Sequence, residues 1–174
     1  LVELILQESS KVIRHRKGVL VVQNHHGVIL ANAGIDRSNL EQDKEQDWVL
    51  LLPKDSDLSA KKIHQELFSK TGVHLGVIIN DSIGRAWRNG TLGTAIGVAG
   101  IPSIIDLRGR KDLFGNPLRV SEEAIADELA SAASLLQGQA DEALPVVLIR
   151  GFQTQTASIP ASGLIRPKET DLFQ

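Results

Sequence analysis

The apolar positions along the chain recur with two different periods, which predicts a mixture of helices and strands. Residues 1–14 repeat at the helical period and predict a first helix. A second helix is predicted from a cap at Asp57 or Ser59 to Lys70, stopped by Gly72, and a third from a cap at Ser121 to a stop at Gly138. The inward faces of these last two helices are predicted to consist of Ile63 and Leu67, and of Ile125, Leu129, Ala133 and Leu136.

Short apolar runs between turn residues predict strands at 19–22, 28–31, 48–52, 75–79 and 145–149. Segments 36–47 and 106–119 are charged and predict loops, and the tail from Phe152 is predicted to be irregular. Segment 94–101 is rich in Ala and Gly, so we expect its backbone to approach another segment closely. Because strands and helices do not alternate regularly, the pattern predicts an α+β fold with mixed sheets and packed helices.

The composition narrows the class of protein without identifying it. The chain has 174 residues, 42 % of them hydrophobic, a net charge of −2 and no Cys or Met. This length fits a single domain spanning 1–174, and the charge balance argues against a nucleic-acid or membrane partner. No apolar run approaches the roughly 20 residues that cross a bilayer, so we expect a cytoplasmic protein. Leu1 opens inside a helical pattern, and we expect further sequence before it.

Oxygen-bearing side chains follow two of the apolar runs. Asp81 and Ser82 come directly after the run 76–79, and Asp36 and Asn39 come after the run 28–35. Each group is open to two interpretations: polar residues that make local turns, or hard oxygen ligands for Mg²⁺ or Mn²⁺ beside a phosphate.

Three further motifs remain equally open. Arg85 and Arg88 flank Trp87. They either form a solvated face with the indole ring packed inward, or provide guanidinium groups that recognise phosphate or carboxylate. Segment 137–142 is either a helix stop with a polar loop or a source of ligands, Gln139 above all. His25 and His26 lie at a predicted hairpin turn, where we expect one to be exposed and one packed, without zinc.

Taken in order along the chain, these segments resemble one family. They read NHHGVILANAGIDRSN, then VIINDSIGRAWRNGTLGTAIGVAGI, then LRGRKDLFGNPLRVSEEAIADELASAASLLQGQADEALPVVLIRG, and finally LIRPKETDLF. This order is similar to that of the γ-glutamyl ligases that add glutamate to the deazaflavin coenzyme F420. The resemblance covers nearly the whole chain, and family members carry a further N-terminal portion that supplies part of the nucleotide site.

The resemblance implies GTP-dependent amide formation between the phospholactyl carboxylate of the precursor F420-0 and L-glutamate, followed by γ-linked glutamate. It places divalent metal ligands, for Mg²⁺ or Mn²⁺, at Asp36, Asp81, Ser82 and Gln139, and a GTP contact at Asn39. We expect two such ions, and also K⁺. The family's nucleotide loop falls on Gln137, Gly138, Gln139, Ala140, Asp141, Glu142, Ala143 and Leu144. Family members form intertwined dimers, so a homodimer is expected.

The chain departs from the family pattern at a few positions. Ser82 replaces a threonine and keeps the hydroxyl, whereas the segment at Thr94 lacks the family's acidic residue. An acyl phosphate is the expected intermediate, and Arg85 and Arg88 are our own candidates for binding phosphate or substrate carboxylate during catalysis. Two other interpretations stay open: a non-catalytic module that binds nucleotide or deazaflavin, and a generic Mg²⁺-dependent phosphotransferase.

Overall fold

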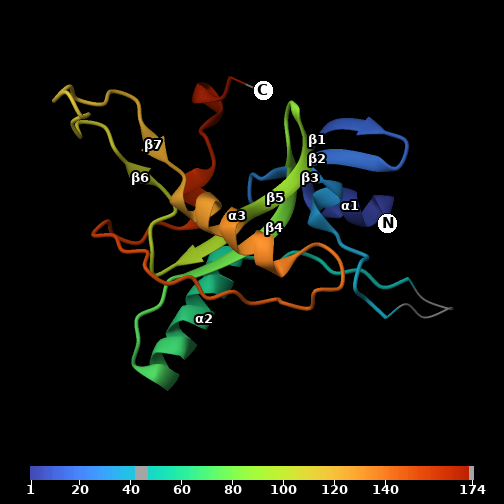
Figure 1. Ribbon diagram of the computed structural model, residues 1–174. Coiled ribbons are helices and arrows are strands. Elements are labelled where there is room, and N and C mark those ends of the chain that lie inside the picture. The colour runs from blue at the N-terminus through green and yellow to red at the C-terminus, as the bar shows by residue number, and fades with distance from the viewer. Residues whose placement is uncertain (42–46, 173–174) are drawn as a thin grey trace.

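The fold combines small antiparallel sheets with packed helices, which confirms the α+β class (Figure 1). The computed structural model describes residues 1–41 and 47–172. Within those residues the helices are α1 (Val2–Gln7), α2 (Ser56–Thr71) and α3 (Ile125–Gln137), with short 3₁₀ turns η1 (Asn32–Gly34), η2 (Ala161–Leu164) and η3 (Lys168–Thr170). The strands are β1 (Ser9–Arg16), β2 (Val19–Asn24), β3 (Ile29–Ala31), β4 (Val77–Arg85), β5 (Arg88–Ala99), β6 (Ile105–Asp106) and β7 (Glu122–Glu123).

The N-terminal segment corrects the prediction of one helix over residues 1–14. Helix α1 ends at Gln7, where the Ser9 hydroxyl donates a hydrogen bond to the Ile5 carbonyl, and the chain continues as β1. The β-branched pair Val12 and Ile13 favours an extended backbone, and β1 pairs antiparallel with β2, which pairs in turn with β3. Long-range strand pairing therefore overrides the helical periodicity of this segment.

The β4–β5 hairpin is the central element of the fold (Figure 1). The predicted strand 75–79 is in fact the beginning of β4, which continues through the polar motif to Arg85. The register places Asp81 opposite Thr94 and Ile83 opposite Leu92. The motif that was expected to form a turn or a loop is thus held in a strand, and its backbone position is fixed by the ladder.

The close backbone approach predicted for 94–101 is confirmed at Gly97, where a Cβ would overlap the Ser56 carbonyl group of α2. Helix α3 also crosses β5 at a very short distance, next to this segment at Gly93. A Cβ atom on Gly93 would lie 2.4 Å from the Ala130 carbonyl oxygen. Polar groups one helical turn apart also join the two elements: Asp127 accepts a hydrogen bond from the Ala95 N–H at 2.9 Å, and the Ser131 hydroxyl donates to the Gly93 carbonyl at 2.8 Å. The position of the C-terminal end of α3 is therefore fixed relative to β4–β5.

The start and inward face of α3 differ from the prediction. Ser121 does not cap the helix, because Glu122 and Glu123 pair with β6 as β7 and the Ser121 carbonyl accepts from the Leu107 N–H. The helix begins at Ile125 and ends at Gln137, with Gly138 as its C-cap. Ile125 is buried as predicted, whereas Leu136 is 62 % exposed.

Helix α2 is capped by Asp55, whose carboxylate accepts from the Leu58 N–H at 2.8 Å, and not by Asp57 or Ser59. Gly72 ends the helix in the left-handed conformation, as predicted. The helix packs on β5 through its first turns, with Ser56 and Ala60 buried, so Ile63 is exposed rather than inward.

Two predicted strands are absent from the described residues. Segment 48–52 makes only a single bridge, between Leu50 and Asp36, and segment 145–149 has no strand partner. Within the predicted loop 36–47, residues 42–46 lie outside the described part of the chain. None of the described helices is long and apolar enough to cross a membrane.

Candidate functional site

Asp36 is held at a fixed point beside the β1–β3 sheet. Its backbone exchanges two hydrogen bonds with Leu50, at 3.0 and 2.8 Å. The preceding Gly34 has a φ of +73°, and a Cβ there would lie 2.6 Å from a methyl carbon of Leu52, so no other residue fits this turn without strain. The Asp36 carboxylate accepts hydrogen bonds from the Ser38 N–H and hydroxyl, both at 2.7 Å.

Asp81 projects from β4 and is more buried than Asp36. Its carboxylate accepts from the Ser82 N–H at 2.7 Å. Burial raises the pKa of Asp81, the hydrogen bond from Ser82 opposes this, and the negative charge of Asp36 raises the pKa further. Asp36 responds in the opposite direction: partial burial opposes ionisation, but the hydrogen bonds from Ser38 and the Arg37 backbone outweigh it and lower the pKa of Asp36.

The negative charge of Asp36 thus acts on Asp81, the more buried of the two carboxylates, and disfavours its ionised form. A divalent cation would offset this effect, and carboxylate and hydroxyl oxygens are the ligands that Mg²⁺ and Mn²⁺ prefer. Ser82 follows Asp81 directly and is exposed. No group of three His, Cys, Asp or Glu side chains forms a metal site in the described residues. The donor set that fits a hard cation consists of two carboxylates supplemented by neutral oxygens.

The loop that follows α3 is brought to these carboxylates by two long-range hydrogen bonds. The Asn39 side chain donates to the Ala140 carbonyl at 2.9 Å, and Asn80, next to Asp81, donates to the Gln137 side-chain oxygen at 2.9 Å. Three segments that are far apart in the sequence thus meet at one place. The segments were predicted to act together, but Asn80 was not identified as the link.

The backbone N–H groups of the loop converge on a carboxylate of the loop itself. The Ala140 N–H donates to Glu142 at 2.9 Å. Hydrogen bonds from the backbone of Ala140, Glu142 and Gln139 outweigh desolvation and lower the pKa of Glu142. The Gln139 side chain is exposed and makes no hydrogen bond to the described residues. The loop thus presents N–H groups that already bind an anionic group.

Arg85 and Arg88 are not brought to the carboxylate pair. They face each other across the end of the β4–β5 hairpin, and both are exposed. Four residues of extended strand separate Arg85 from Asp81, about 13 Å. Neither arginine forms an ion pair with a described residue. Trp87 at the turn is 90 % exposed, which corrects the interpretation that its ring packs inward.

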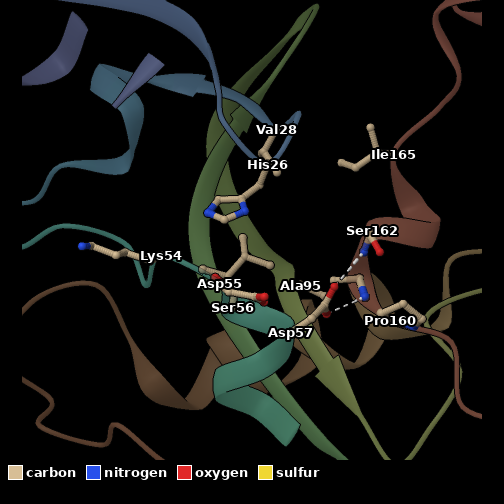
Figure 2. Close-up of a pocket in the computed structure, with 12 residues that line it drawn as sticks. His26, Val28, Lys54, Asp55, Ser56, Asp57, Ala95, Pro160, Ser162 and Ile165 are labelled. Carbon is tan, nitrogen blue, oxygen red and sulfur yellow. Dashed lines mark hydrogen bonds between the residues drawn. The ribbon is translucent and has the colours of Figure 1, made fainter. Parts of the chain in front are cut away.

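A cavity of about 500 Å³ opens beside this centre (Figure 2). It lies between the β2–β3 turn, the first turn of α2, β5 and η2. His26 lines it, and both His25 and His26 are exposed, so the expectation of one packed histidine is wrong. Asp57 also lines it, with carboxylate oxygens that accept from the backbone N–H groups of Val98, Ala161 and Ser162. The sequence did not predict that Asp57 links α2 to β5 and η2, since its position near the start of a helix gives no signal of these distant partners.

Comparison with known proteins gives consistent matches. A family model described as F420-0:Gamma-glutamyl ligase matches residues 1–151. A protein of Methanocaldococcus jannaschii named coenzyme F420:L-glutamate ligase is 44 % identical over 173 residues, which cover 99 % of this chain and 68 % of the relative. Proteins of the same name from Methanothermobacter thermautotrophicus and Methanopyrus kandleri are 46 % and 38 % identical, over 100 % and 99 % of this chain and 68 % and 69 % of theirs.

Proposed function

Because the chain belongs to the F420-0:gamma-glutamyl ligase family, we propose that it is an amide-forming ligase that adds L-glutamate to the deazaflavin precursor F420-0. The observation that carries this proposal is the meeting of three distant segments. Asp36, Asp81 and the loop after α3 are joined by the hydrogen bonds Asn39–Ala140 and Asn80–Gln137. The family match extends over the segments that make this centre.

We assign a divalent cation, Mg²⁺ or Mn²⁺, to Asp36, Asp81 and Ser82, with Gln139 as a further oxygen donor. The fit rests on the chemistry of the donors and on the negative charge of Asp36, which raises the pKa of Asp81. When bound, such an ion neutralises phosphate oxygens and draws them towards a carboxylate. Backbone hydrogen bonds hold the two carboxylate-bearing residues in place, Asp36 through its Leu50 bridge and Asp81 through the β4–β5 ladder.

GTP is the proposed phosphoryl donor, with Asn39 and residues 137–144 around it. The terminal phosphoryl group passes to an oxygen of the acceptor carboxylate, which gives an acyl phosphate and GDP. The glutamate amine then attacks the carbonyl carbon, the carbon–oxygen bond to phosphate breaks, and inorganic phosphate and a proton are released. Such transfer depends mainly on positioning and charge neutralisation. Glu142 occupies the loop N–H groups in this structure, and a phosphate group would compete with it for them.

Arg85 and Arg88 are proposed to reach the far end of a substrate rather than the carboxylate pair, since they lie at the hairpin turn. Guanidinium groups bind phosphate or carboxylate bidentately. We also propose that a second, γ-linked glutamate is added and that the protein forms a homodimer. A single monodisperse monomer by light scattering would contradict the dimer.

Mass spectrometry of the product tests the proposal. The protein is incubated with F420-0, L-glutamate, GTP and Mn²⁺, and each component is omitted in turn. The expected product is heavier by one or more glutamyl units and forms only when all four are present, together with inorganic phosphate. Nucleotide binding without any mass change would favour a non-catalytic binding module, and phosphate release without glutamate would favour a different phosphotransfer reaction.

A further inference from the structure

The cavity beside the carboxylate pair contains a polar group that the fold itself does not use. Ser56 lines this cavity and is only 4 % exposed. The Ser56 hydroxyl forms no hydrogen bond with any described residue. In the described part of the chain, however, every side-chain oxygen or nitrogen that is inaccessible to solvent has a hydrogen-bond partner. The Ser56 hydroxyl is therefore not shut off, and the space it opens into is the cavity.

The neighbouring groups carry both signs of charge. Asp55 uses one carboxylate oxygen to cap α2, and its other oxygen accepts no hydrogen bond from the described residues. The Asp57 carboxylate is held rigidly by three backbone N–H groups. His26 faces these carboxylates from the opposite wall, and Lys54 stands at the rim with its ammonium group directed away from them (Figure 2). The free N–H groups at the start of α2 add positive character.

This combination suits an amino acid better than it suits the anionic groups of the other two substrates. A triphosphate or the phospholactyl group carries only negative charge, which Asp55 and Asp57 would repel. An amino acid carries an ammonium group that suits these carboxylates and carboxylates that suit His26, Lys54 and the helix start. The remaining wall, which includes Val28 and Ile96, is apolar and suits methylene groups. A volume of about 500 Å³ is within the usual range of small-molecule sites.

The cavity also lies where an incoming amine is needed. Ile96 lines it and is two residues along β5 from Thr94, the residue opposite Asp81. Two residues of strand span about 7 Å. An amino acid held in the cavity therefore lies beside the same stretch of β5 that pairs with Asp81.

We propose that this cavity, formed by His26, Asp55, Ser56 and Asp57 with Lys54 at its rim, is the binding site for the L-glutamate that the reaction consumes. The proposal rests on the proposed ligase function and adds to it the site and the groups that recognise the amino acid. Asp55 and Asp57 receive the ammonium group, the Ser56 hydroxyl donates to a carboxylate, and His26 lies opposite them at the anionic end, with Lys54 adding positive charge at the rim.

Steady-state kinetics of two conservative variants test the assignment. Asp55→Asn retains a good helix cap but removes the charge, so the KM for L-glutamate should rise roughly 10- to 100-fold while α2 stays folded. Ser56→Ala removes a hydroxyl that has no partner in the fold, and the same KM should rise roughly 3- to 10-fold. In both variants the KM for GTP and for F420-0 should stay at the wild-type value. Ser69→Ala, far along the same helix and bonded only to its own backbone turn, is the matched control and should change nothing.

Calorimetry separates failure of this inference from failure of the proposed function. L-Glutamate is titrated into the wild-type protein and into Asp55→Asn, without turnover. If the wild type binds L-glutamate and Asp55→Asn does not, the cavity assignment is supported. This holds even if no glutamyl product forms, a result that would contradict only the ligase proposal. A wild type that ligates glutamate while both cavity variants keep its KM overturns the assignment. A rise in the KM for F420-0 instead of that for glutamate overturns it as well, because the cavity would then hold the acceptor.

Discussion

The contact between α3 and β5 sets the position of the proposed nucleotide loop, and Gly93 is the residue that allows it. A Cβ at this position would lie 2.4 Å from the Ala130 carbonyl oxygen, 2.9 Å from its carbonyl carbon and 2.8 Å from the Ser134 Cβ. Two of these three atoms belong to the helix backbone, so no rotamer change relieves the overlap. Gly93→Ala should therefore push α3 away from β5 and weaken the hydrogen bond between Ser131 and Gly93.

The expected loss follows from two opposing terms. Overpacking costs about 1–3 kcal/mol, and the upper end applies because backbone atoms have to move. Removing the extra freedom of a strand glycine returns about 0.5–1 kcal/mol. The net free energy of unfolding of Gly93→Ala should thus fall by about 2 kcal/mol, which lowers the midpoint of urea unfolding by roughly 1 M.

Gly84→Ala is the matched control for this measurement. Gly84 lies in the same hairpin, and a Cβ there would meet nothing within 4 Å. Its midpoint should equal that of the wild type or exceed it slightly. A midpoint for Gly93→Ala at or above that of Gly84→Ala would refute the close contact between α3 and β5.

Three further changes test other parts of the structure. Asp55→Ala removes the cap of α2 and should lower the free energy of unfolding by about 1 kcal/mol, whereas Asp55→Asn should leave it unchanged. Equal midpoints of urea unfolding for the two variants would count against the cap. The hydrogen bonds and charge of Arg108 lower the pKa of Asp106 to about 2, so Arg108→Gln should return it towards 3.8 in an NMR titration. Because the folded pKa is depressed, the contribution of Asp106 to the stability of the β6–β7 pair is complete above pH 3.8 and is lost as the pH falls towards 2. A titration unaffected by Arg108→Gln would exclude this ion pair. Asn39→Ala removes the bond to the Ala140 carbonyl and should speed hydrogen exchange in the loop, while unchanged protection there would show that the link does not order it.

The sequence predicted those elements whose determinants are local. The strand at 19–22 and the helix stops at Gly72 and Gly138 are present, because a short apolar run and a glycine with positive φ at a helix end act over a few residues. The α+β class followed from the order of these elements. The candidate carboxylates Asp36 and Asp81 were also found from the sequence, since each ends or follows an apolar run.

Elements that depend on distant partners were predicted incorrectly. The segment 1–14 has a helical pattern, but β1 forms because β2 lies beside it. Segment 145–149 has the composition of a strand but no partner among the described residues. Asp57 was expected to cap α2, whereas three backbone groups from β5 and η2 bind its carboxylate. None of these contacts leaves a short-range signal in the sequence.

We have proposed that Asp81, with Asp36, holds the cation on which glutamate addition depends. The most direct test compares the rate of glutamyl product formation by the wild type and by Asp81→Asn at matched Mn²⁺, with circular dichroism to confirm that the variant is folded. We expect a folded variant whose turnover is lower by about 100-fold or more, since a metal contributes several kcal/mol of charge stabilisation. A folded Asp81→Asn protein that forms product at a rate near that of the wild type would contradict it.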